Sequence, residues 1–149
     1  GLATVEDEDL ELAKGLLVTM QAGGAEFTLT FRGLADAAES EAATERVRGL
    51  FTEPEKFDAW AERWRARLAR DPQEPALRAS RMRSVSPALI PRNHLVEAAL
   101  AAAVERDDLG PFERLHAALA RPFEVRPEDA DLIAPPPASD QPYRTFCGT

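Results

Sequence analysis

One stretch of the sequence, from Thr52 to Leu68, does most to decide what kind of fold this chain can adopt. It opens with the capping-box pattern T-x-x-E, in which Thr52 and Glu55 bond free backbone N–H groups at a helix start, and Pro54 suits the first turn. The apolar residues that follow fall on one side of that helix: Phe57, Trp60, Trp64 and Leu68. A helix with one broad apolar side must bury that side against another element, so we expect a domain of packed helices.

The N-terminal segment also repeats apolar residues at helical spacing. Asp7 and Asp9 suit the positive end of a helix dipole, and Gly23-Gly24 stop the helix. Its predicted apolar side consists of Leu10, Ala13, Leu17 and Met20.

Residues 26–34 are ambiguous between strand and helix. Phe27, Leu29 and Phe31 alternate as in a strand, whereas Phe27, Phe31 and Leu34 repeat as in a helix. Nothing nearby offers a pairing strand, so we predict a helix, followed by another over residues 41–50.

The second half of the chain continues the helical pattern. Asp71 is the expected N-cap of a helix that must end before Pro87. The alanine-rich residues 92–105 and a last helix after Gly110-Pro111 follow, with these apolar positions: Leu95, Ala98, Ala99 and Ala102, then Phe112, Leu115 and Leu119.

From Pro122 onward the helical pattern dissolves. Residues 135–137 are all proline and favour an extended polyproline conformation. The predicted fold is therefore all-α, an array of about seven helices with an irregular proline-rich C-terminal tail. We place the helical domain at residues 1–121 and the tail at residues 122–149.

Charge and cysteine content narrow the possible partners. A net charge of -8 gives no general attraction to nucleic acid or anionic membranes, and we expect neither as a partner. No apolar run approaches the roughly 20 residues of a membrane span. The single cysteine, Cys147, cannot form a disulfide within the chain, which fits a reducing, cytoplasmic location or a partner sulfur elsewhere.

Few side chains stand out as candidates for chemistry. His94 and His116 have no second histidine or cysteine at metal-ligand spacing, and we interpret them as surface or packing residues. Trp60 and Trp64 could form a binding platform, but their place on an apolar helix side favours the core.

Arginines crowd the middle of the chain and could bind a phosphate or an acidic protein surface. The simpler interpretation is a solvated face paired with nearby acids such as Glu53, Glu55, Asp58 and Glu62. The arginines concerned are Arg63, Arg65, Arg67, Arg70, Arg78, Arg81 and Arg83. No glycine-rich phosphate loop, kinase sequence block or nucleophile elbow is visible in the sequence.

Two groups of motifs resemble the SelO family in the family's order. In R-M-R-S-V-S-P-A-L-I-P-R-N-H-L-V-E-A-A-L the matching positions are Pro87, Arg92, Asn93, Leu95 and Ala98. The stretch E-F-T-L-T-F-R-G-L is similar to a family helix at Thr28, Thr30, Phe31 and Arg32, and F-D-A-W-A-E-R-W-R-A-R-L resembles the helix after it. Arg121, Pro122 and Phe123, the prolines 135–137 and the terminal cysteine complete the resemblance.

The sequence departs from the family pattern at a few positions. Ser86 replaces the usual asparagine, Pro91 a leucine and His94 an aromatic residue, and the tail ends C-G-T rather than C-S-S. The departures at Ser86, Pro91 and His94 concern the local geometry of the junction around residue 92.

The resemblance implies more than the residues alone. SelO proteins are similar to protein kinases in fold and transfer AMP from ATP to hydroxyl side chains of proteins, with Mg²⁺ or Mn²⁺. It implies that the nucleotide and metal sites lie in a kinase-like region before this sequence, so we assign no catalytic, cofactor or metal residue here. It also implies a redox role for Cys147, as a disulfide to that region.

Two hypotheses of function follow. In the first, the chain is the C-terminal helical region of a SelO-like protein, has no AMP-transfer activity alone, and supports the kinase-like domain that modifies protein substrates. In the second, it is a free-standing helical module that binds a protein through the Trp60/Trp64 side or the arginines.

Overall fold

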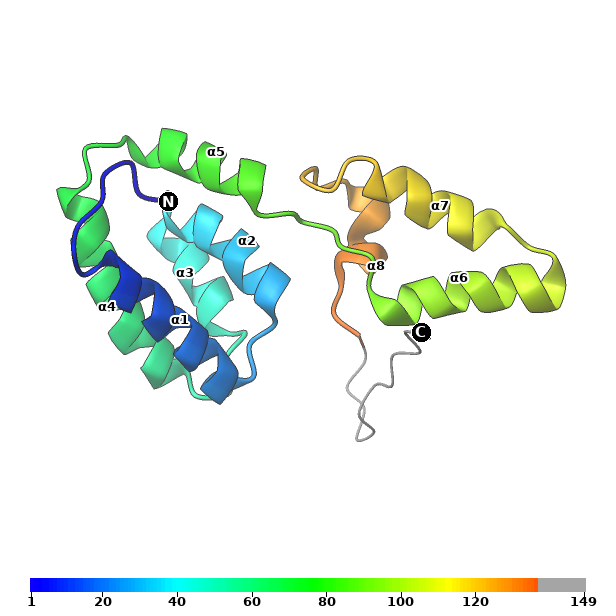
Figure 1. The fold of residues 1–149 in the computed structure, drawn as a ribbon, viewed down its shortest axis with the longest axis horizontal. Helices are drawn as coiled ribbons and strands as arrows, with labels where there is room; N and C mark the ends of the chain where they lie inside the picture. The colour runs from blue at the N-terminus through cyan, green and yellow to red at the C-terminus, as the bar shows by residue number, and fades with distance from the viewer. Residues whose placement is uncertain (137–149) are drawn as a thin grey trace. The chain divides into compact units, whose positions relative to one another are not determined.

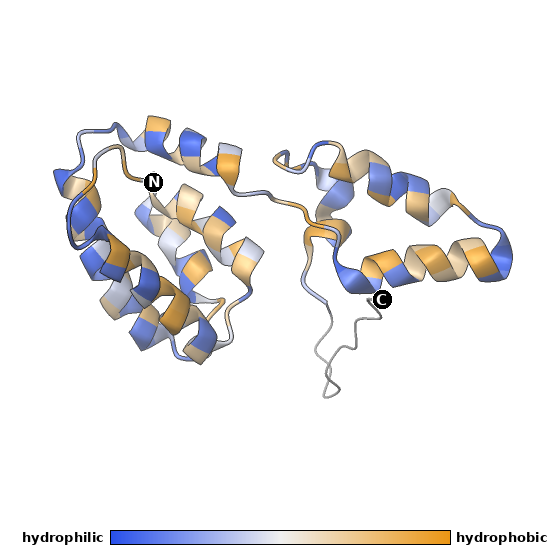
Figure 2. Cartoon of the chain, in the orientation of Figure 1, coloured by the Kyte–Doolittle hydropathy of each residue, from blue (hydrophilic) through white to orange (hydrophobic). Residues whose placement is uncertain are grey.

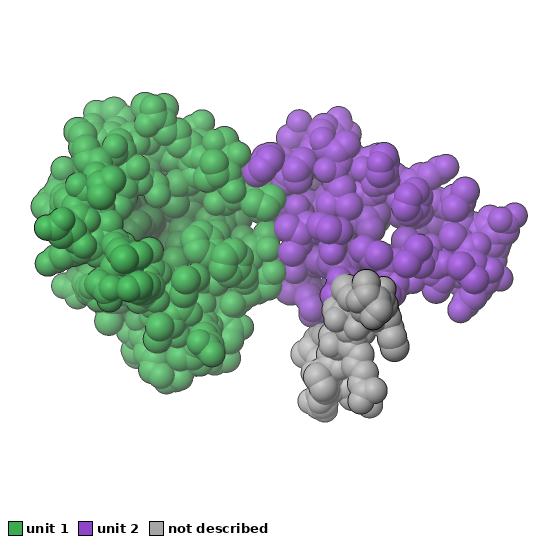
Figure 3. All heavy atoms as spheres, viewed as in Figure 1, with its two compact units in different colours: residues 1–87 green, residues 88–149 purple. Residues whose placement is uncertain are grey.

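The computed structural model describes residues 1–136, in which all regular structure is helical (Figure 1). The all-α prediction is therefore confirmed for this range. The chain forms two compact units, residues 1–87 and 88–149, which Figure 3 colours separately. The predicted division between a helical domain, residues 1–121, and a tail, residues 122–149, stays a prediction.

Unit 1 contains five helices, and they agree with the predicted segments within a few residues. The ambiguous segment after Gly24 is a helix, as expected. The helices are α1 (Asp9–Gly23), α2 (Phe27–Ala37), α3 (Glu41–Arg48), α4 (Pro54–Arg70) and α5 (Pro75–Val85). Gly24 ends α1 in the left-handed region, with φ 61°, and donates its N–H to the Met20 carbonyl, as the glycine pair predicts.

The core of unit 1 forms where α1 packs along α4 and α2 packs between α3 and α5 (Figure 1). Phe57 is fully buried and stacks on Phe51 with ring centroids 4.8 Å apart. The indole N–H of Trp60 donates to the Leu12 carbonyl at 2.9 Å, so its one polar atom is paired inside the core. A Cβ atom at Gly33 would lie 2.7 Å from Val47 Cγ2, which shows how closely α2 approaches α3.

The predicted buried side of α1 is right for Met20 and wrong for Leu10, Ala13 and Leu17. Leu12, Leu16 and Met20 face the core, whereas Leu10 is 63% exposed and Leu17 is 48% exposed. Both rows have helical spacing, so the pattern could not decide between them. Packing against α4 selects the row that contains Leu12.

Two predicted N-caps are also wrong. Thr52 donates its hydroxyl to the Gly23 carbonyl at 3.1 Å instead of capping α4, whose N-cap residue is Glu53. Asp71 ends α4 rather than starting α5, whose N-cap is Glu74. In both cases the side chain forms a hydrogen bond to a residue distant in the sequence, Gly23 for Thr52 and Ala3 for Asp71, instead of capping the next helix.

Unit 2 is built around a hairpin of α6 (Asn93–Arg106) and α7 (Gly110–Leu119). A short helical turn follows, η1 (Pro127–Asp129) and α8 (Ala130–Ile133), where the sequence predicts irregular tail. Leu132 of α8 is buried with Leu89 and Leu115, so this part of the predicted tail belongs to the core of unit 2. The Pro122 carbonyl accepts from the N–H groups of Ala88 and Leu89, at 2.8 and 3.1 Å.

The core of unit 1 generates a stability prediction. Phe57→Ala should lower the free energy of unfolding by about 3–5 kcal/mol, because it leaves a cavity at a fully buried position. Both tryptophans lie in α4, so urea denaturation followed by tryptophan fluorescence reports on unit 1.

The matched control is Val18→Ala on α1, where the side chain is 66% exposed. It should change the free energy of unfolding by less than about 0.5 kcal/mol. An equal loss in the two variants would contradict the assignment of the core.

Candidate functional site

The redox candidate Cys147 lies outside the described residues, so its role stays a prediction. Among residues 1–136, the densest group of charged side chains lies in unit 1, where the N-terminal segment meets the ends of α4 and α5. We call this group the Asp71 cluster: Thr4, Glu6, Asp9, Arg67, Asp71 and Arg78.

Asp71 is the centre of the cluster, and its carboxylate is buried. Oδ2 accepts from the backbone N–H of Ala3 at 2.8 Å and of Thr4 at 3.1 Å. Oδ1 accepts from the N–H of Gln73 at 3.1 Å and from Arg78 Nη2 at 3.2 Å. One side chain therefore joins the N-terminal segment to the turn after α4 and to α5.

Arg67 supplies the second buried charge and is 2% exposed. Its Nε donates to Asp9 Oδ1 at 2.7 Å and its Nη2 donates to the Thr4 carbonyl at 2.8 Å. Its Nη1 lies 3.3 Å from Glu6 Oε1 and 3.9 Å from Asp71 Oδ2. The N-terminal segment is thus held to α4 by charge as well as by packing.

The carboxylates of the cluster are held in the charged state. Burial raises the pKa of Asp71, but hydrogen bonds from Ala3, Thr4, Gln73 and Arg78 outweigh burial and place the pKa well below its ordinary value. The hydrogen bond from Arg67 likewise lowers the pKa of Asp9. The cluster is suited to a structural role, because its carboxylates already accept hydrogen bonds from the protein itself.

Two other arginines of the predicted band are also paired with acids. Arg70 binds Glu6 at 2.7 Å, and Arg83 binds Asp36 at 2.7 Å. Pairing with acids is confirmed for Arg67, Arg70, Arg78 and Arg83, but Arg67 and Arg78 are buried rather than solvated. The acids also differ from those predicted: Glu53 pairs with Lys56 and Asp58 with Arg48. Sequence neighbours were the wrong guide, because the acids that pair with the band come from other elements.

The aromatic and histidine candidates belong to packing. Trp60 and Trp64 are 6% and 5% exposed and stack with ring centroids 5.5 Å apart, so the core interpretation is confirmed. His94 is half-buried, and His116 is exposed and stacks on Phe112. No three His, Cys, Asp or Glu side chains gather as a metal site among residues 1–136.

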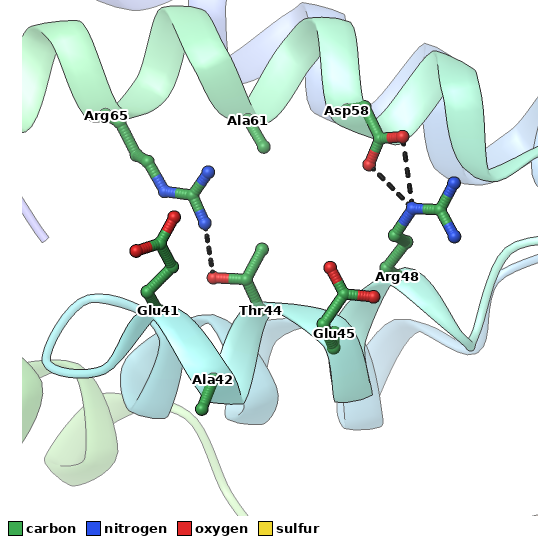
Figure 4. A pocket seen from close by; sticks show the side chains of 8 residues that line it. All are labelled: Glu41, Ala42, Thr44, Glu45, Arg48, Asp58, Ala61 and Arg65. Carbon is green, nitrogen blue, oxygen red and sulfur yellow. Dashed lines mark hydrogen bonds and ion pairs between the residues drawn. The ribbon is translucent and has the colours of Figure 1, made fainter.

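Figure 4 shows a pocket of about 390 Å³ between α3 and α4. Arg65 Nη2 donates to Thr44 Oγ1 at 2.6 Å on one side, and Arg48 Nε donates to Asp58 Oδ1 at 2.9 Å on the other. With Glu41 and Glu45 also at its rim, the pocket combines both signs of charge, and no single ligand class fits it.

Two arginines from the quoted motifs bind carbonyls at helix ends. In unit 1, Arg32 Nη1 donates to the carbonyls of Arg83 and Ser86, at 2.9 and 3.0 Å. In unit 2, Arg92 Nη2 donates to the Ile133 carbonyl at 3.1 Å, at the end of α8. The last carbonyls of a helix lack helical partners and form the negative end of its dipole, so a cation fits there.

Comparison with known proteins identifies the family. The sequence model described as protein adenylyltransferase SelO matches residues 1–120. Protein nucleotidyltransferase YdiU of Bradyrhizobium sp. (strain ORS 278) is 52% identical over the whole chain, which covers 30% of that protein. The YdiU proteins of Methylorubrum populi and Rhizobium meliloti are 52% and 51% identical, and the chain covers 31% and 30% of them.

The chain belongs to the SelO family. It spans about 30% of the length of the curated relatives it matches. Of the arginines at the matching positions quoted above, Arg32 and Arg92 bind protein backbone. No helix in that range is both long and apolar enough to cross a membrane.

Sequence reasoning missed the Asp71 cluster, although one signal was present. Arg67 follows Trp60 by seven residues and Trp64 by three, which places a charge on the apolar side of α4. A charge in such a position needs a buried partner. Asp71 follows Arg67 at the i,i+4 spacing of a helical pair, but Asp9 lies 58 residues away and could not be found from spacing.

The Asp71 cluster predicts a pH dependence of stability. The folded-state pKa of Asp71 lies below its unfolded-state value, so its contribution is complete above the unfolded-state pKa and is lost as the pH falls toward the folded-state pKa. The thermal midpoint of unit 1 should be flat from about pH 7 to 5 and fall below about pH 4. Tryptophan fluorescence measures this midpoint.

Asp71→Asn should lower the midpoint by about 10 °C at pH 7, because Arg78 loses a buried partner, and should flatten the fall at acid pH. The slope does not vanish, because Asp9 and Glu6 also have lowered pKa values. Asp58→Asn, in an exposed pair with Arg48, is the control and should shift the midpoint by no more than about 2 °C. If the thermal midpoint of Asp71→Asn fell with acid pH as steeply as that of the wild type, Asp71 would not be a source of the acid dependence.

Proposed function

We propose that this chain is the C-terminal helical region of a longer SelO-family protein that transfers AMP from ATP to Ser, Thr or Tyr hydroxyls of proteins. In this proposal the chain supports a kinase-like domain and contains no catalytic residue itself. Two findings support it: the family match over residues 1–120, and relatives that are about 50% identical but more than three times as long.

The observation that carries the proposal is the behaviour of the two motif arginines. Arg32 and Arg92 each bind the carbonyl end of a helix within their own unit. A residue that bound substrate would leave its guanidinium directed at an open pocket. The motif arginines instead fix helix ends, which is the role of a supporting region.

ATP and Mg²⁺ or Mn²⁺ do not fit the described residues. A metal-bound triphosphate needs convergent carboxylates and a phosphate-binding loop, and residues 1–136 contain no gathered metal ligands. In this proposal the described residues take no part in AMP transfer. The proposal places nucleotide, metal and protein substrate in the part of the longer protein that this chain does not cover.

The second hypothesis, a free-standing interaction module, loses the tryptophan side and most of the arginines on which it depended. Trp60 and Trp64 are buried, and Arg67, Arg70, Arg78 and Arg83 pair with acids of unit 1. No specific contact in residues 1–136 favours that function over the family assignment.

A labelling experiment tests the proposed function. The 149-residue chain and the longer protein are each incubated with ATP labelled at the α-phosphate, Mg²⁺ or Mn²⁺, and an acceptor protein. We expect label on the acceptor only with the longer protein. Robust AMP transfer by the chain alone would refute the proposal.

The supporting role has a separate variant test. In the longer protein, Arg32→Met should lower the temperature of heat inactivation by several degrees while AMP transfer at low temperature is retained. Arg63→Met, at an exposed position of the same unit, should change neither. Loss of transfer at all temperatures with unchanged heat stability would place Arg32 in the active site instead.

The redox role of Cys147 also belongs to this proposal, in a cytoplasmic bacterial protein. Since the chain has one cysteine, a disulfide needs a thiol from outside it. Oxidised glutathione would accept the two electrons and two protons released when the two thiols join. We expect the longer protein to lose two free thiols on this treatment and the Cys147→Ser variant to lose none; equal losses would contradict the role.

A further inference from the structure

The helix α6 has an unusual sequence for a helix at a protein surface. Every residue from Ala98 to Val104, A-A-L-A-A-A-V, is apolar, which is almost two complete helical turns. A surface helix has a polar side and an apolar side, and a helix that is apolar all round is buried. The sequence of this stretch therefore requires cover on both sides.

The structure covers only one side of α6. Ala99 and Ala102 are buried, while Leu100 is 53% exposed and Val104 is 85% exposed. Leu100 and Val104 lie four residues apart on one side of the helix, and we call them the α6 row. Val96, four residues before Leu100, is half-buried and packs against the core of unit 2. Figure 2 shows that most of α6 has apolar colours, whereas α4 alternates between apolar and charged residues.

The small core of unit 2 is a second reason to expect that another apolar surface covers the α6 row. Its fully buried cluster consists of Leu89, Leu115, Ala118 and Leu132. Ala88, Ala99 and Ala102 are buried as well, but alanine side chains are small, so the described part of unit 2, residues 88–136, gains little free energy from burial. Cover over the α6 row would supply part of the missing burial.

We propose that the α6 row is a docking surface for an apolar helix in the part of the longer protein that this chain lacks. This inference rests on the proposed function and on the length of the relatives, of which the chain covers 30%. The row offers no polar atom to a charged or hydrogen-bonding partner. The small side chain of Ala103 beside it allows a second helix to approach closely.

Hydrogen exchange tests the docking surface. The amides of residues 98–104 should exchange at least about tenfold more slowly in the longer protein than in the 149-residue chain. The double variant Leu100→Glu, Val104→Glu should abolish this slowing. It should leave exchange in the 149-residue chain unchanged, because both side chains are exposed there and glutamate is a good helix former.

Val125→Glu is the matched control. It makes the same chemical change at a position of unit 2 that is 63% exposed and lies outside α6. We expect it to leave the exchange of residues 98–104 unchanged in both proteins.

Several outcomes would overturn the inference. Slowing that is absent, or that survives the double variant, would show that the longer protein does not cover the row. A dimer of the 149-residue chain that the double variant dissociates, seen by sedimentation, would assign the row to a second copy. If the double variant of the 149-residue chain is monomeric and its residues 98–104 exchange faster, the α6 row is covered by another part of the same chain.

AMP transfer by the longer protein is measured in parallel. Protection of α6 without AMP transfer would refute the proposed function and leave the docking surface standing. AMP transfer without protection of α6 would refute the docking surface and leave the proposed function standing.

Discussion

The buried carboxylate of Asp71 is the interaction on which the arrangement of unit 1 depends. It binds the backbone of residues 3, 4 and 73 and the guanidinium of Arg78, and it lies at the end of the central helix α4. A buried charge is tolerated only when its hydrogen-bonding capacity is filled by fixed partners. The N-terminal segment and the α4–α5 turn must therefore adopt the positions that fill it, and apolar packing alone would not fix them so narrowly.

The sequence was sufficient to predict the helices but not their tertiary contacts. The apolar side of α4 was predicted correctly because Phe57, Trp60, Trp64 and Leu68 form its one broad apolar side. In α1 two apolar rows compete, and only the contact with α4 decides between them. The turn formed by η1 and α8 was missed because four helical residues are too few to show a period.

The candidate site shows the same limit. Composition and spacing indicated correctly that the arginines pair with acids and that the tryptophans are core residues. The acids that pair with Arg67 and Arg83 come from other helices, so no local pattern contains them. The family motifs located Arg32 and Arg92, but only the structure showed that both bind helix ends. A family resemblance can thus identify important residues without revealing whether they act on substrate or on the fold.

The close approach of α2 to α3 at Gly33 has a consequence for how the family can vary. A Cβ atom at position 33 would collide with Val47 Cγ2, so the combined volume of the side chains at positions 33 and 47 is limited. A larger residue at position 33 becomes tolerable only if position 47 shrinks at the same time. In related proteins, substitutions at positions 33 and 47 should therefore occur together, although the two residues lie on different helices.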